Sequence, residues 1–153
     1  MRLSTRGEYA TRILLELCAT EEEVMSVADL AARTAIPAKY LEQLMLRLRS
    51  ARVVRSKRGV HGGYALARRP DALTVGEVIR VMDGPLAPRP CASQSAHVPC
   101  PTYRGPWEEA CVLRSLWLQV RKATAGVLDG TTFAELAERQ RRASTSCSEM
   151  YYI

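Results

Sequence analysis

The chain has 153 residues, 47% of them apolar and 25% charged, with a formal net charge of +6 at pH 7. This length fits one compact domain, or a small domain with an added interaction helix. No apolar run approaches the roughly 20 residues that span a bilayer, and residues 1–8 lack a signal peptide's apolar stretch, so we expect a cytoplasmic protein without membrane contact.

Helical periodicity in the first third of the chain predicts three helices. The first covers about residues 5–19, with Thr5 and Glu8 at the spacing of a capping box. The second begins near Ser26, and the third covers about residues 38–51. A proline before the third helix predicts a tight turn, because proline suits the first turn of a helix and not its interior.

Two short strands are predicted next, at residues 53–54 and 64–66, around a glycine-rich tip at 57–63. Two helices joined by a tight turn and followed by a hairpin make a winged helix-turn-helix. The expected fold is therefore mainly α with a small β-hairpin wing. With a fourth helix at about 74–82, residues 1–82 form the predicted DNA-binding domain.

The second half of the chain has a different organisation. Residues 83–106 are proline-rich, contain two cysteines and read as an irregular loop. A long amphipathic helix is predicted at about 107–128, and a last helix at about 132–141. Together they make a segment 107–142 whose apolar face exceeds what the small domain needs, which favours a homodimer. The tail, 143–153, shows no clear pattern. The apolar stripe of the long helix consists of Leu113, Leu116, Trp117, Val120, Ala123, Thr124 and Val127.

Positive charge is concentrated in one stretch. Residues 33–69 carry ten Lys or Arg and one acid, Glu42, whereas the rest has twelve bases against fifteen acids, a net of −3. A one-signed field on a compact motif indicates a polyanion, most simply duplex DNA, although a solvated basic face is the alternative. The expected DNA contacts are Lys39, Tyr40, Gln43 and Arg47 on the recognition helix, and Arg52, Arg55, Lys57, Arg58 and His61 around the wing.

Several segments, in this order, resemble one family. Residues 3–10 (LSTRGEYA), 36–44 (IPAKYLEQL), 58–67 (RGVHGGYALA) and 111–117 (CVLRSLW) are similar to the IscR- and NsrR-type regulators of the Rrf-two family. The resemblance covers about residues 1–140. It implies a homodimeric repressor or activator, often one that holds an iron–sulfur cluster.

Five cysteines cannot all pair within one chain, and three of them, Cys91, Cys100 and Cys111, are the candidate cofactor ligands. Their wide spacing does not suit a zinc knuckle, and thiolates are the preferred ligands of iron–sulfur clusters. The family's cysteines are spaced more closely, so both 2Fe–2S and 4Fe–4S types stay open. A thiol switch, a zinc site, no cofactor, or a site of Cys91 and Cys111 alone are the alternatives. Of the remaining two, Cys18 is expected to pack, and Cys147 receives no role.

Three thiolates leave one iron coordination position, and the resemblance suggests its ligand. IscR-like members use a histidine shortly after the last cysteine, where this chain has Arg114. NsrR-like members use an acid on the first helix of the partner subunit, and Glu8 stands at that position. A helix cap is its alternative role, and His97 is the other candidate ligand.

The sequence therefore predicts a transcription regulator and not an enzyme. It has no nucleophile–base pattern, no phosphate-binding loop before a helix and only two histidines. The expected trigger is an iron–sulfur cluster that senses redox state, nitric oxide or iron–sulfur supply. The alternatives are a cofactor-free or thiol-switch regulator and an RNA-binding winged-helix module.

Overall fold

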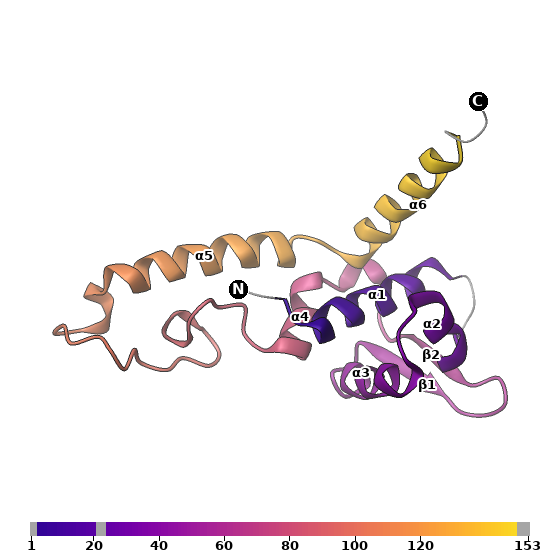
Figure 1. The fold of residues 1–153 in the computed structure, drawn as a ribbon, viewed down its shortest axis with the longest axis horizontal. Coiled ribbons are helices and arrows are strands. Elements are labelled where there is room, and N and C mark those ends of the chain that lie inside the picture. Colours follow the sequence, from indigo (N-terminus) through magenta and orange to yellow (C-terminus); the bar gives the residue numbers. More distant parts are fainter. Residues whose placement is uncertain (1–2, 21–23, 150–153) are drawn as a thin grey trace.

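The computed structural model describes residues 3–20 and 24–149 of the chain (Figure 1). Residues 3–83, the winged domain, gather at one end of the molecule, while residues 84–129, the cysteine arm, run out from it and return along a long helix (Figure 1). The helices are α1 (Thr5–Ala19), α2 (Val27–Thr34), α3 (Ala38–Ser50), α4 (Val75–Asp83), α5 (Val112–Asp129) and α6 (Phe133–Glu149). The shorter elements are strands β1 (Val54–Lys57) and β2 (Gly63–Leu66), and the 3-10 turns η1 (Pro70–Ala72), η2 (Pro90–Ala92) and η3 (Glu108–Ala110).

Side-chain caps set the starts of the first helices. The Ser26 hydroxyl accepts from an α2 backbone N–H, and Thr74 does the same for α4, as their positions predicted. The cap of α1 is different from the predicted one. The Ser4 hydroxyl accepts from Gly7 N (3.2 Å), and Ser4 N donates to Asp83 Oδ2 (3.0 Å). The capping box of Thr5 with Glu8 was therefore wrong, because the distant Asp83 carboxylate holds Ser4 extended one position earlier.

The winged domain has a closed apolar core. The predicted inner face of α1 is buried, as are Leu41, Leu44, Met45 and Leu48 of α3. Phe133, the first residue of α6, is fully buried in the same core, and its N–H donates to Leu73 O (3.0 Å). The start of α6 is thus fixed to the winged domain, although it follows the arm in sequence.

Two predicted helix boundaries were wrong. The long helix begins at Val112 and not near 107, because Cys111 is extended (φ −74°, ψ 110°) and η3 precedes it. The last helix continues past Arg141 to Glu149. Arg141 and Arg142 both pair with Glu138 one turn earlier, and the sequence offers no glycine or proline to stop the helix. Residues 150–153 of the predicted tail lie outside the described residues.

A tight joint connects the arm to the winged domain. Arg80 of α4 donates two hydrogen bonds to the Asp129 carboxylate at the end of α5, at 2.6 and 2.8 Å. Gly76 lies under this carboxylate, where a Cβ atom would collide with it. In the described ranges, no helix is long and apolar enough to cross a membrane.

Candidate nucleic-acid interface and cysteine pocket

The recognition helix presents one polar stripe. Lys39, Gln43 and Arg47 are spaced by one turn each on α3 and are all exposed, while the opposite face enters the core. Tyr40 lies beside them but is half-buried. Its ring packs edge-to-face on the Tyr9 ring, with the two ring centroids 5.9 Å apart. Tyr40 therefore also positions α3 against α1.

The wing is a short antiparallel hairpin whose glycines are required by its geometry. Gly59 has φ +111°, which favours glycine, and its carbonyl accepts from Gly62 N (2.9 Å). Gly63 lies against the Met25 backbone, which exchanges two 2.8 Å hydrogen bonds with Tyr64. This bridge ties the wing to the segment before α2. The predicted contacts Arg52, Arg55, Lys57, Arg58 and His61 are all exposed.

Sequence reasoning did not include Arg49 among the candidate DNA contacts. Arg49 lines a groove of about 330 Å³ between α3 and the wing, together with Lys57 and Arg58. Helical periodicity shows that Arg49 is exposed, but only the position of the folded hairpin shows that it faces the wing.

The three candidate ligand cysteines line one pocket of about 350 Å³. Cys91 comes from η2 and is buried, Cys100 comes from the loop, and Cys111 directly precedes α5; the latter two are half-buried. Trp117 and Tyr103 supply apolar surface, and Arg89 and Arg114 supply positive charge. Among the described residues, however, no three His, Cys, Asp or Glu side chains are close enough together to hold one metal ion. The thiols are spread around the pocket wall.

The pKa values of two cysteine thiols are displaced in opposite directions. The Thr102 hydroxyl, 3.3 Å from Cys100 Sγ, and then the Thr102 backbone lower the pKa of Cys100, with a smaller effect from the Arg89 charge. Burial raises the pKa of Cys18, on α1, to about 11. Cys100 is therefore the more nucleophilic thiol of these two. Cys18 packs against the core, as predicted.

Two arginines of α5, seven residues apart, fasten the Cys91 turn to the helix. Arg114 Nε donates to Cys91 O (3.0 Å), and Arg121 Nη1 donates to Ala92 O (2.9 Å). We call Arg114 and Arg121 the arginine clamp. Glu108 lies beside it, with its Oε1 atom 3.5 Å from Arg114 Nε and its Oε2 atom 3.0 Å from His97 Nε2. The sequence signalled neither contact, because the partners are backbone carbonyls of an irregular loop.

The two candidates for a fourth ligand lie outside the pocket of their own chain. His97 faces Glu108. Glu8 is exposed on α1 and pairs with Arg12 (2.7 Å). Neither residue lines the cavity that the three cysteines share.

The outer face of α5 is an exposed apolar stripe. Its members follow a spacing of three and four residues, which is that of a coiled-coil seam: Leu113, Leu116, Val120, Ala123 and Val127. Val127 is 67% exposed and Leu113 58%. Trp117 and Thr124, predicted on the same stripe, are instead half-buried. The predicted surplus of apolar surface is confirmed.

Comparisons with known proteins agree with this architecture. Residues 3–139 match the Rrf2 family model, described as an iron-dependent transcriptional regulator. CymR of Bacillus subtilis is 37% identical over 138 residues, 90% of each chain. Its solved structure, titled the global cysteine regulator, has a TM-score of 0.73 over 91% of this chain and 98% of that one.

Two further solved structures fit the same pattern. T. potens IscR is 31% identical and has a TM-score of 0.73, with 94% of this chain and 90% of that one covered. An oxidized form of Staphylococcus aureus CymR is 30% identical and has a TM-score of 0.67 over 90% and 97%. The match of nearly the whole chain in sequence and in fold leads to one conclusion: the chain belongs to the Rrf2 family of DNA-binding transcription regulators and is not an enzyme.

Proposed function

We propose that this chain is a homodimeric regulator whose affinity for a duplex operator depends on the state of its cysteine pocket. One observation carries the proposal: three cysteines line one pocket that is fastened to α5, the helix with the exposed apolar seam. Acting on chromosomal DNA, such a regulator would be cytoplasmic.

The DNA contacts of the proposal come from the recognition helix and the wing. The amide of Gln43 has the donor and acceptor pattern that reads an adenine edge, and Lys39 and Arg47 flank it on the exposed stripe of α3. Arg52, Arg55, Lys57, Arg58 and His61, together with Arg49, are assigned to phosphates beside the groove. Exposed cations of this density give binding that falls steeply with salt.

The dimer of the proposal forms along α5. The 18 residues of this helix have no buried member, yet its seam has coiled-coil spacing. A second copy covers the seam and sets the distance between two recognition helices, which must match half-sites about 34 Å apart.

The residue types that line this pocket are those that hold iron–sulfur clusters. Cys91, Cys100 and Cys111 would supply three thiolate ligands, and Arg89 and Arg114 would offset their negative charge. Glu8 of the partner subunit is the proposed fourth ligand, and both 2Fe–2S and 4Fe–4S types fit three thiolates. A bound cluster would supply iron centres that react with oxidants and nitric oxide.

The arginine clamp gives the pocket a route to the dimer helix. Arg114 and Arg121 hold the Cys91 turn against α5, and Leu113 of the seam borders the same pocket. A change that moves Cys91 toward the pocket or away from it therefore also moves the Cys91 and Ala92 carbonyls, to which these guanidinium groups donate. This displacement reaches the helix that spaces the two winged domains.

A thiol switch is the second candidate, and the lowered pKa of Cys100 favours it. With a peroxide as oxidant, the Cys100 thiolate takes one oxygen to form a sulfenic acid and releases hydroxide. A second pocket thiol then forms the disulfide and releases water. The solved oxidized form of a CymR relative is consistent with such chemistry in this family.

One experiment separates the two candidates. The protein is purified anaerobically, and its visible absorbance, iron, acid-labile sulfide and operator affinity are measured. The cluster proposal expects colour, iron and sulfide, all lost in Cys111→Ala together with a change in operator affinity, and retained in the control Cys18→Ala. A colourless, iron-free protein whose operator affinity changes after peroxide treatment, and only with Cys100 present, establishes the thiol switch. Identical operator affinity in all states rejects both.

A further inference from the structure

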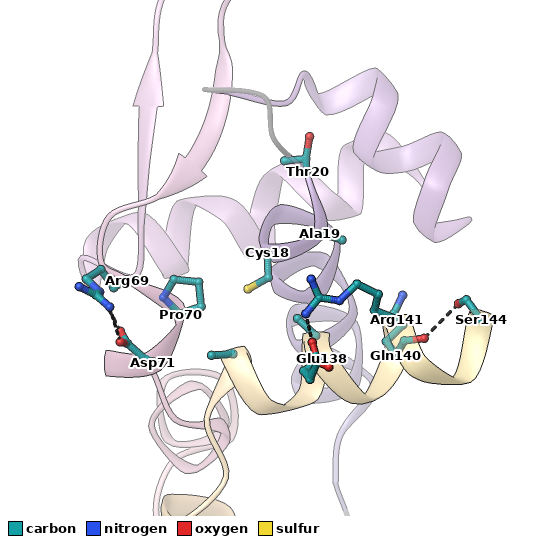
Figure 2. A pocket seen from close by; sticks show the side chains of 12 residues that line it. Cys18, Ala19, Thr20, Arg69, Pro70, Asp71, Glu138, Gln140, Arg141 and Ser144 are labelled. Atoms are coloured by element: carbon teal, nitrogen blue, oxygen red, sulfur yellow. Dashed lines mark hydrogen bonds and ion pairs between the residues drawn. The ribbon is translucent and has the colours of Figure 1, made fainter. Parts of the chain in front are cut away.

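A second cavity, of about 680 Å³, lies away from the cysteine pocket (Figure 2). Its walls come from three elements: the end of α1, the turn η1 that follows the wing, and the first turns of α6. The cavity therefore lies between the winged domain and the helix that follows the arm. Its volume is within the range of small-molecule sites.

Part of the wall of this cavity is apolar. It is formed by small side chains, Ala19 of α1, Pro70 of η1, and Ala134 and Ala137 of α6. Cys18 points into the space between Pro70 and α6 (Figure 2), and because its thiol stays neutral it adds to the apolar surface. Such a lining accommodates a short aliphatic group.

The rim carries paired charges on two of its walls. On the η1 wall, Arg69 donates two hydrogen bonds to the Asp71 carboxylate, at 2.7 and 3.2 Å. On the α6 wall, Glu138 pairs with Arg141 (Figure 2) and also with Arg142, which does not line the cavity. Asp71 is 53% exposed and Arg69 84%, so both charges are within reach of a ligand.

This charge arrangement discriminates among ligand classes. A ligand of a single sign is attracted by one member of each pair and repelled by the other, so its net gain is small. A zwitterion meets an opposite charge at both of its ends. The end of α1, which has no basic residue in its last turn, adds a partial negative charge that favours an ammonium group.

We propose that this cavity binds a small zwitterion with an aliphatic body, an α-amino acid or a dipeptide. The ammonium group is held between Asp71, Glu138 and the end of α1, and the carboxylate by Arg69 and Arg141. Because its walls belong to two parts of the molecule, a bound ligand holds α6 against the winged domain. The proposal is independent of the cysteine pocket.

Binding to the full-length protein is measured by calorimetry with the twenty L-amino acids and a set of aliphatic dipeptides. At least one is expected to bind with a Kd below about 1 mM, and its N-acetylated and C-amidated forms at least roughly tenfold more weakly. The proposal is overturned if no free zwitterion binds at up to about 10 mM, or if the blocked forms bind equally well.

Variants locate the site. Ala137→Trp fills the cavity and is expected to abolish binding, while Ala143→Trp, an exposed position of α6 outside the cavity, leaves binding unchanged. Asp71→Asn removes one carboxylate without adding volume, and roughly tenfold weaker binding is expected. Equal loss in both tryptophan variants, or unchanged binding in Asp71→Asn, places the ligand elsewhere and refutes the assignment.

Discussion

The winged domain buries its large apolar side chains, whereas the long helix of the cysteine arm exposes them. In the winged domain, Leu30, Leu41 and Leu48 are fully buried within a single chain. In the arm, α5 buries no residue, and Val112 is 80% exposed. The first region closes its core with Phe133 of α6, whereas the second leaves the apolar seam of α5 exposed. A regulator built in this way can keep its DNA-reading part rigid while the arm responds.

The most severe test of this contrast places a charge in the α5 seam. Leu116→Asp is expected to produce a monomer, because the buried carboxylate has no partner across the seam. Loss of the second winged domain should weaken operator binding on the order of a hundredfold or more. Light scattering and titration with a duplex selected from a random library measure both effects. Gln119→Asp, on an exposed position outside the seam, is the control; equal losses in both variants contradict an α5 dimer.

The converse test is a cavity in the winged domain. Leu44→Ala removes a side chain that is 1% exposed, so a loss of about 2–5 kcal/mol in the free energy of unfolding is expected. Leu113→Ala, at a position 58% exposed in the chain, should cost less than about 0.5 kcal/mol in the Leu116→Asp monomer. Urea unfolding followed by circular dichroism compares them. A large cost for Leu113→Ala in the monomer shows that the arm buries its seam by itself.

The winged domain was more predictable than the arm because its signals are local. The buried stripe of α3 follows from 3.6-residue periodicity, and Ser26 and Thr74 cap the helices that they precede. The cap at Ser4 depends on a carboxylate 79 residues away, and no local pattern shows it. In the arm, the three cysteines were recognised by residue type, yet the extended Cys111 and the Arg121 contact depend on loop backbone.

A smaller effect tests the attachment of the Cys91 turn. Arg121→Ala removes the donor to Ala92 O, a hydrogen bond worth about 1 kcal/mol, and should raise the rate of Cys91 alkylation roughly fivefold. Lys122→Ala, an exposed neighbour on α5, should leave this rate unchanged. Mass spectrometry of the apoprotein after timed alkylation gives the rates residue by residue. An unchanged Cys91 rate in Arg121→Ala shows that this guanidinium does not hold the turn.

The smallest expected effect concerns the joint between the two regions. The hydrogen bond from Arg80 lowers the pKa of Asp129, so this carboxylate contributes stability above its unfolded pKa of about 3.9 and loses it as pH falls through the lower folded value. Because the pair is half-exposed, Asp129→Asn should cost only about 0.5–1 kcal/mol at pH 7 and nothing at the lowest pH. Thermal unfolding from pH 7 down to about 2.5 measures the difference, with Glu109→Gln as an unpaired control. A cost that is independent of pH assigns the effect to the close approach of Asp129 to Gly76, and the joint is then steric and not ionic.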